Sequence, residues 1–390
     1  MPAADANPPT RSSAESTPEL PPSGSVSGGF DPRSIDAGRI ECLQVLDEHG
    51  NVDAGLDPGY PDEELLRVHR AMVLSRAFDA RMFAMQRQGQ MGTFAPNLGQ
   101  EACMIGQVWP LGRDDWFSPS YRSFGSQIWR GWSMDRLMML WAGYHDGFPP
   151  PEGVNDLPFS IVIGSHVLPA AGIAMGMRRA NDQHCVVVNF GDGAFSQGAV
   201  TEALNFASVD NAPIVFVCEN NGWAISTPIE KQAGTDVLAM RGLGYGVRSL
   251  RVDGNDMLAM MLAMDEACTR ARNGQGPTLI EAITFRMSLH TTADDPTVYR
   301  DESLVEPWKK RCPISRFELY LTGKNLLTPQ RADEIRDECE QEVLDARSRF
   351  REEAKADPRA IFDHLYATLP DELEEQRLAY LRRLDRKGVK

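Results

Sequence analysis

Short apolar runs alternate with longer segments of helical periodicity through the middle of the chain. Apolar runs of the length typical of buried strands are found at residues 185–189, 214–219 and 278–285. Segments whose apolar residues recur at helical spacing are found at residues 62–88, 196–209 and 257–273. Because strands that alternate with helices form parallel sheets, this pattern predicts an α/β fold with a doubly wound, mostly parallel sheet flanked by helices.

The two ends of the chain differ from this middle part. Residues 1–34 are rich in Pro, Ser, Ala and Gly, so we expect a disordered tail that cannot bury enough apolar surface to fold. Residues 35–320 contain the alternating pattern and are expected to form the α/β domain. Residues 321–390 are expected to form a helical extension, because 330–356 has the i, i+4 charge pairs of a solvated amphipathic helix. We expect this extension to serve packing or subunit contact.

The composition is that of a soluble globular protein, since 42% of the 390 residues are hydrophobic and 24% are charged. The net charge of -15 argues against a nucleic acid partner, because an acidic surface without a basic patch repels a polyanion. No apolar run approaches the roughly 20 residues that a membrane span needs. We therefore expect neither nucleic acid binding nor a membrane segment.

The cysteines and the amino terminus indicate the compartment. Seven cysteines are scattered along the chain without any C-x-x-C spacing, which favours reduced thiols over disulfides or a zinc site. The first 34 residues include acidic side chains such as Glu15 and Glu19, and they lack the basic and apolar regions of a targeting peptide. The predicted location is cytoplasmic.

Polar residues follow two of the predicted strands at their carboxyl ends. The first strand runs into Gly-Asp-Gly-Ala at 191–194, and the second runs into Asn-Asn-Gly-Trp at 220–223. A right-handed crossover between the strands would make their ends neighbours, so that Asp192 and Asn221 could share one cation. Either sequence alone is typical of an ordinary turn. Together they predict a magnesium ion that bridges a diphosphate, because carboxylate, amide and phosphate oxygens are the ligands that Mg²⁺ prefers.

The run from Gly191 to Asn221 resembles the thiamine-diphosphate motif, in which GDG is followed about 25 to 30 residues later by NN. Further segments resemble the alpha subunits of 2-oxo-acid dehydrogenases. These segments are GTFAPNLGQEA at 92–102, SYR at 120–122, NGWAIST at 221–227 and HTTADDPTVYR at 290–300. The similarity covers about residues 60–320. It implies the thiamine-diphosphate-binding fold, with thiamine diphosphate and Mg²⁺ as cofactors.

The resemblance implies a role for each residue that matches a family position. Asp192, Asn221 and the main-chain oxygen of Trp223 match the magnesium ligands, although the family usually has tyrosine in place of the tryptophan. The residues that match the diphosphate contacts are Tyr121, Arg122, Gly193 and Ala194. Ile161 and Ile163 match positions that hold the aminopyrimidine ring and the bent shape of the cofactor. Without the resemblance, both isoleucines would be assigned to the core.

His290 matches the histidine at the start of the family's active-site loop, and Arg286 matches an arginine four residues earlier. The resemblance implies that both residues bind the cofactor and that His290 is catalytic. An imidazole suits this role because it can hold phosphate charge or move a proton near neutral pH. Some relatives carry a regulatory phosphoserine just after this histidine. Thr291 and Thr292 occupy that place here, so we do not expect kinase control by that route.

The implied activity is oxidative decarboxylation of pyruvate, with transfer of the acyl group to a lipoyl domain. In the family, a glutamate that activates the aminopyrimidine comes from a separate beta subunit, so the chain alone is expected to be inactive. The implied assembly is an alpha2-beta2 heterotetramer that works with a lipoyl acyltransferase core. The protein's own task would be to position the cofactor and to supply charge around it.

Several alternatives stay open. Residues 92–102 resemble bacterial pyruvate dehydrogenase alpha subunits, whereas 221–227 and the pair Asp294-Asp295 also suit branched-chain enzymes that use 3-methyl-2-oxobutanoate. Acetoin dehydrogenase is a third member of the same family. A non-catalytic homologue is a different class of protein, but the intact site residues argue against it. A magnesium-dependent phosphohydrolase lacks an evident nucleophile beside the strand end.

Overall fold

The structure is a computed structural model that describes residues 39–355, 357–363 and 365–388. The predicted disordered tail at 1–34 lies outside the described residues. Within them, the chain has a mixed α/β architecture, as the sequence pattern predicted. The proposed division between residues 320 and 321 stays a prediction.

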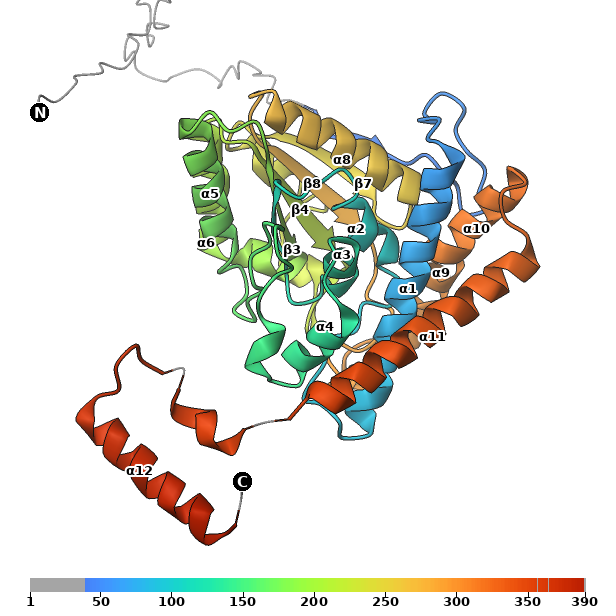
Figure 1. The fold of residues 1–390 in the computed structure, drawn as a ribbon. Coiled ribbons are helices and arrows are strands. Elements are labelled where there is room, and N and C mark those ends of the chain that lie inside the picture. Colours follow the sequence, from blue (N-terminus) through green and yellow to red (C-terminus); the bar gives the residue numbers. More distant parts are fainter. Residues whose placement is uncertain (1–38, 356, 364, 389–390) are drawn as a thin grey trace, which may run out of the picture. The chain divides into compact units, whose positions relative to one another are not determined.

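A six-stranded parallel sheet forms the centre, in the order β1-β7-β8-β4-β3-β2 (Figure 1). Its strands are β1 (Glu41–Leu43), β2 (Trp116–Ser118), β3 (Val186–Gly191), β4 (Ile214–Asn220), β7 (Arg248–Asp253) and β8 (Thr278–Ile283). A separate antiparallel hairpin consists of β5 (Trp223–Ala224) and β6 (Thr227–Pro228). The three predicted strands are thus confirmed, although the third ends two residues earlier than expected.

Helices flank the sheet, and further helices follow it along the chain. They are α1 (Asp62–Arg87), α2 (Glu101–Gly106), α3 (Phe124–Trp129), α4 (Met134–Trp141), α5 (Val167–Arg179), α6 (Gly198–Val209), α7 (Met240–Leu243), α8 (Met257–Arg272), α9 (Glu306–Lys310), α10 (Pro313–Gly323), α11 (Pro329–Glu353) and α12 (Asp371–Arg386). Short 3-10 helices are η1 (His145–Gly147), η2 (Asp192–Ser196), η3 (Ile229–Lys231), η4 (Pro296–Val298), η5 (Glu302–Leu304) and η6 (Pro358–Phe362). No helix of the described residues is long and apolar enough to cross a membrane.

The two faces of the sheet are covered by different helices. Val186 and Val188 pack with α5 and α6, whereas Val187 belongs to the core that contains α1, α2 and α8 (Figure 1). This alternation follows from the pleat of a strand, because successive side chains point to opposite faces. Both faces are therefore buried, which explains why the strands read as almost uninterrupted apolar runs.

The predicted amphipathic helix at 330–356 is present as α11, which ends at Glu353. Its apolar stripe, which includes Ile335, Val343 and Phe350, is buried in the same core as α1. Its polar side forms ion pairs with α1, such as Arg70 with Glu342 at 2.7 Å. The helix thus packs along α1, in agreement with the packing role that the sequence suggested.

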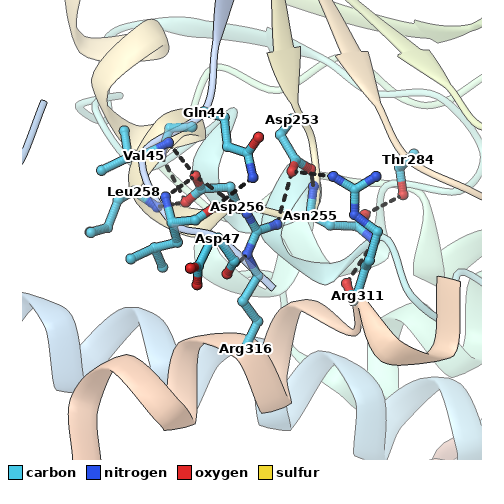
Figure 2. Close-up of polar contacts among 12 residues, drawn as sticks. Gln44, Val45, Asp47, Asp253, Asn255, Asp256, Leu258, Thr284, Arg311 and Arg316 are labelled. Atoms are coloured by element: carbon cyan, nitrogen blue, oxygen red, sulfur yellow. Dashed lines mark hydrogen bonds and ion pairs between the residues drawn. The ribbon is translucent and has the colours of Figure 1, made fainter. Parts of the chain in front are cut away.

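A buried polar cluster ties the start of the described chain to the sheet (Figure 2). The carboxylate of Asp256 accepts from the N–H groups of Leu258 and Ala259 at the start of α8, and from those of Val45 and Leu46 at 2.6 and 2.7 Å. Arg316 of α10 donates to the main-chain oxygens of Leu46 and Asp47 and, at 2.9 Å, to Asp253. One carboxylate and one guanidinium therefore join three distant parts of the chain. These bonds satisfy buried backbone groups that would otherwise lack partners.

We predict that Asp256→Ala lowers the free energy of unfolding by about 3 kcal/mol or more. The change removes a helix cap, leaves two buried N–H groups unpaired and leaves buried Arg316 short of a nearby negative charge. Urea unfolding followed by circular dichroism measures the loss. Thr328→Ala is the control, because it removes only the solvent-exposed cap of α11 and should cost about 1 kcal/mol. Equal losses in the two variants would contradict the prediction.

Candidate active site

The two polar strand ends lie side by side. Strands β3 and β4 pair in parallel, with Gly191 opposite Glu219, so both chains leave the sheet at the same edge. The N–H group of Asn221 donates to the Asp192 carboxylate at 3.3 Å. The predicted closeness of these two residues is therefore confirmed.

A cavity of about 270 Å³ opens at this edge. The sequence-predicted site residues that line it are Tyr121, Arg122, Ile163, Asp192, Gly193, Ala194, Asn221, Trp223 and His290. Two predicted residues do not line it. Arg286 is 1% exposed and lies behind His290, with which it shares a contact, and the side chain of Ile161 is 61% exposed on the neighbouring loop.

Oxygen atoms converge at one end of the cavity. Asp192 is buried and accepts from Gln232 at 3.0 Å, and burial raises the pKa of its carboxyl group. The side-chain oxygen of Asn221 accepts from the N–H group of Trp223 at 3.2 Å, and its NH₂ group donates to Gln100. A cation between Asp192 and Asn221 would favour the ionised carboxylate that burial disfavours.

No group of three or more His, Cys, Asp or Glu residues that could hold a metal ion occurs in the described part of the chain. The set expected from the sequence is of a different kind, because it contains one carboxylate, one amide and one main-chain oxygen. Such a set suits Mg²⁺, which binds proteins through few carboxylates and takes its other ligands from water and phosphate.

Positive charge gathers at the other end of the cavity. Arg122 is 5% exposed and donates to the main-chain oxygens of Pro96 and His290, the latter at 3.1 Å. Arg286 donates to the main-chain oxygen of Ile225 and to the Tyr299 hydroxyl, both at 2.7 Å. Neither guanidinium forms a direct ion pair with a carboxylate within the described residues, and the Tyr299 hydroxyl stands between Arg286 and Asp294. Buried cations of this kind are typical of an anion site.

His290 lies between the two arginines. A guanidinium nitrogen of each lies 3.4 Å from its Nδ1 atom, so Nδ1 faces two donors and the ring proton belongs on Nε2. Burial and the charges of Arg122 and Arg286 lower the pKa of His290 to about 4. The imidazole is therefore neutral at neutral pH. Its main-chain N–H donates to Asp294 at 2.8 Å, which holds the start of the loop.

Exposed apolar side chains stand beside the cavity. Ile161, Val162 and Ile163 are 61%, 69% and 43% exposed, so the interpretation of the two isoleucines as core residues is wrong. Ile225 also lines the cavity, and it has a positive φ of 54°, a strained conformation for a β-branched residue. Exposure of this kind and backbone strain are both typical of functional surfaces.

Further polar residues that support the site were not predicted from the sequence. His166 and Glu219 line the cavity, while Asn189 and Gln107 lie buried beside them. Burial raises the pKa of Glu219 to about 7. Single polar residues inside the apolar strand sequences VVVNF and IVFVCE are the signal that could have identified Asn189 and Glu219. No comparable signal marks His166 or Gln107, since each lies far from the strands in the sequence.

The fold and the cavity define an α/β protein that binds its ligand beyond the carboxyl ends of parallel strands. A family model described as "Dehydrogenase E1 component" matches residues 69–359, more than half of the chain, so the chain belongs to the dehydrogenase E1 component family. This result confirms the resemblance to 2-oxo-acid dehydrogenases. Membership of the family implies thiamine diphosphate as the cofactor.

Curated relatives are similar over most of their length. A protein of Acholeplasma laidlawii named pyruvate dehydrogenase E1 component subunit alpha is 40% identical over 333 residues, which cover 85% of this chain and 96% of the relative. Proteins of the same name from Staphylococcus epidermidis (strain ATCC 35984) and Staphylococcus aureus (strain Mu50) are 37% and 36% identical over 340 residues, which cover 87% of this chain and 92% of each relative.

We predict that, in the protein without ligand, His290 disfavours the folded chain as the pH falls from about 7 to about 5, whereas the raised pKa of Glu219 acts in the opposite direction. The pKa of His290 is about 4 in the folded chain against an ordinary 6.5, so its ring binds more protons in the unfolded chain between these values and acid favours unfolding through this residue. Between pH 7 and pH 5, the melting temperature of His290→Gln should therefore fall less, or rise more, than that of the wild type. The exposed residue His49 provides the control variant, His49→Gln, and a pH dependence that His290→Gln leaves unchanged would contradict the prediction.

Proposed function

We propose that the chain is the alpha subunit of a thiamine-diphosphate-dependent pyruvate dehydrogenase. It would take part in oxidative decarboxylation of pyruvate and in transfer of the acetyl group to a lipoyl domain. The observation that carries this proposal is the cavity itself, which is lined by Asp192, Asn221 and buried Arg122, with Arg286 buried in contact with the lining residue His290. Support also comes from the names of the relatives and from the high coverage of their length.

The cation end fits a magnesium ion that carries a diphosphate. The side-chain oxygens of Asp192 and Asn221 and the main-chain oxygen of Trp223 would bind Mg²⁺. The backbone of Gly193 and Ala194 would contact the diphosphate. A Cβ atom at Gly193 would lie 2.8 Å from that of Ala224, so only glycine permits this close approach of two chain segments.

The positive end fits the diphosphate oxygens. Tyr121 and Arg122 would bind them directly, because a guanidinium can hold two oxygens at once. Arg286 would act on the same anion through its charge and through its contact with His290. Ile161 and Ile163 would hold the aminopyrimidine ring, a role that suits apolar side chains on an exposed loop beside the cavity.

Thiamine diphosphate supplies the nucleophilic carbon and the electron sink that decarboxylation of a 2-oxo acid needs. The chain's own residues position the substrate and hold its charge. His290 would be catalytic, because Nε2 carries the ring proton and could donate it, while a bound anion beside the ring would raise its pKa from about 4. Arg122 and Arg286 would hold the negative charge of the diphosphate.

The partners follow from the same proposal. A beta subunit would cover the exposed side chains of Ile161, Val162 and Ile225 and would complete the site in an alpha2-beta2 heterotetramer. The name "subunit alpha" of the relatives supports a second kind of subunit. A lipoyl acyltransferase core would accept the acyl group. We propose the cytoplasm as the location, on the basis of the composition and the amino-terminal sequence.

We expect this chain, co-expressed with its beta subunit, to reduce an artificial electron acceptor when pyruvate, thiamine diphosphate and Mg²⁺ are present. Either subunit alone should be inactive. Faster turnover of 3-methyl-2-oxobutanoate than of pyruvate would instead assign the branched-chain activity, which the segment 221–227 also suits. Cleavage of acetoin alone would assign the third family activity. A folded complex that binds the cofactor but acts on none of these compounds would indicate a non-catalytic homologue.

Asp192→Ala is expected to abolish magnesium-dependent binding of thiamine diphosphate. Without this carboxylate, the cation that carries the diphosphate lacks one of its ligands. The affinity for thiamine diphosphate should therefore fall by at least about 100-fold, which is the upper end of the loss that follows removal of an outer-shell partner of a metal site. Calorimetric titration of the complex with and without Mg²⁺ measures the loss. Asp210→Ala is the control. Asp210 directly follows α6, pairs with Arg179 at the end of α5 and does not line the cavity. Unchanged affinity in Asp192→Ala would remove Asp192 from the metal site.

A further inference from the structure

Asn189 connects two loops that border the cavity, although it does not line the cavity itself. Its side chain is fully buried within β3, two residues before the strand ends at Gly191. The Oδ1 atom accepts from the N–H group of Ser120 at 2.6 Å and from the Ser123 hydroxyl at 2.9 Å. Its main-chain oxygen lies 2.7 Å from Nε2 of His166, where only the imidazole can donate. One residue thus holds the segments around Ser120 and His166.

The bond to Ser120 replaces a missing part of the sheet. The pairing of β2 with β3 stops at Ser118 opposite Val188, one residue before Asn189. Beyond this point, the N–H group of Ser120 would be the next donor of the β2–β3 ladder. It donates to the side chain of Asn189 instead. Ser120 then closes a tight turn, because its main-chain oxygen accepts from the N–H group of Ser123 at 3.1 Å. Tyr121 and Arg122 are the two central residues of this turn.

A neighbouring glutamate sets the orientation of the Asn189 amide. The Nδ2 atom donates to the carboxylate of Glu219 at 2.5 Å, and the same oxygen accepts from Gln107 at 3.1 Å. The main-chain N–H group of Ser120 can only donate, so the carbonyl oxygen of the amide must face Ser120 and the NH₂ group must face Glu219. Glu219 and Asn189 lie on the same face of adjacent strands, because Gly191 pairs with Glu219 and side chains two residues apart share a face.

The second loop is joined through His166. This residue precedes α5 and ends the segment that contains Ile163 and Gly164, both of which line the cavity. Burial lowers the pKa of His166, which keeps its ring neutral, so Nε2 carries the proton that bonds to Asn189. Ser160, at the start of the segment, forms a parallel bridge with Ser120. The two loops are therefore joined to each other and to the same buried asparagine.

We propose that Asn189 is a positioning residue for the cofactor. It fixes the turn that carries Tyr121 and Arg122, so that the guanidinium is oriented toward the diphosphate before the cofactor binds, and it aligns this turn with the loop of Ile163. It touches no ligand. The inference rests on the proposed function, because it assigns the arginine to the diphosphate. Pre-orientation of this kind raises affinity, since less motion has to be frozen on binding.

The test exchanges the amide of Asn189 and the acid of Glu219 in turn. Asn189→Asp places two carboxylates together, so the turn should lose its anchor and the affinity for magnesium thiamine diphosphate should fall by about 10- to 100-fold. In the double variant that also carries Glu219→Gln, the new amide NH₂ group can donate to the carboxylate at position 189. This double variant should recover most of the affinity. Ser123→Ala removes only one of the two bonds to Oδ1, should fold normally and should cause a smaller loss. Calorimetric titration of the complex measures each affinity.

A second readout separates positioning from a general loss of stability. If Asn189 acts through Arg122, then Asn189→Asp should add little loss of affinity in an Arg122→Ala background. In assays of the complex, the KM for thiamine diphosphate should rise, whereas kcat at saturating cofactor should change little. Additive losses, or a fall in kcat with an unchanged KM, would overturn the proposal.

Asn255→Asp is the matched control. Asn255 is an equally buried asparagine at the carboxyl end of β7, where it donates to the main-chain oxygen of Arg311 at 3.0 Å and accepts from Thr284 at 2.7 Å (Figure 2). Its acid variant should lose stability but keep the cofactor affinity. Equal weakening in both variants would overturn the proposal.

The proposed function and the positioning role of Asn189 can be contradicted separately. A wild-type complex that does not bind thiamine diphosphate in the presence of Mg²⁺ would overturn the proposed function together with the role of Asn189. Wild-type binding that Asp192→Ala abolishes, but that Asn189→Asp leaves unchanged, would overturn the role of Asn189 alone.

Discussion

The parallel pairing of β3 with β4 is the constraint on which the site depends. Its register places Gly191 opposite Glu219, so the two chains leave the sheet at one edge and Asp192 meets Asn221. A shift by one residue would turn every side chain of a strand to the other face. The register is fixed because both faces of the sheet are buried by different helices. The core that stabilises the fold thus also sets the geometry of the cation end of the cavity.

Charge is distributed unevenly around this edge. Buried Asp192 lacks a cation partner at one end, and buried Arg122 and Arg286 lack carboxylate partners at the other. Each of these groups costs free energy in the protein without ligand, because burial disfavours an uncompensated charge. A dinegative ligand with a divalent cation would compensate both ends at once. In the buried cluster of Asp253, Asp256 and Arg316, by contrast, opposite charges are paired (Figure 2). The contrast marks the cavity as the place where a charged ligand belongs.

Much of the fold and of the candidate site could be predicted before the structure. The strands and helices at 185–285 were recognisable because apolar residues line both faces of the sheet. Asp192, Asn221, Arg122 and His290 were recognisable because short motifs carry them. The exposure of Ile161 and Ile163 was not, since an apolar side chain in a sequence says nothing about which surface it meets. The buried residues that orient the binding loops could not be predicted either, because Asn189, Glu219 and His166 come from three separate segments.

The sequence by itself determined the alternation of strands and helices, the family and the polar residues at the strand ends, because these depend on local periodicity and on short spacings. Only the tertiary structure decided which charges remain without partners and which residues orient the binding loops. Both depend on contacts between residues far apart in the chain, such as Asn189 with Ser120 and Arg122 with His290. Local sequence carries no direct record of such contacts, since they form only when the core brings distant segments together.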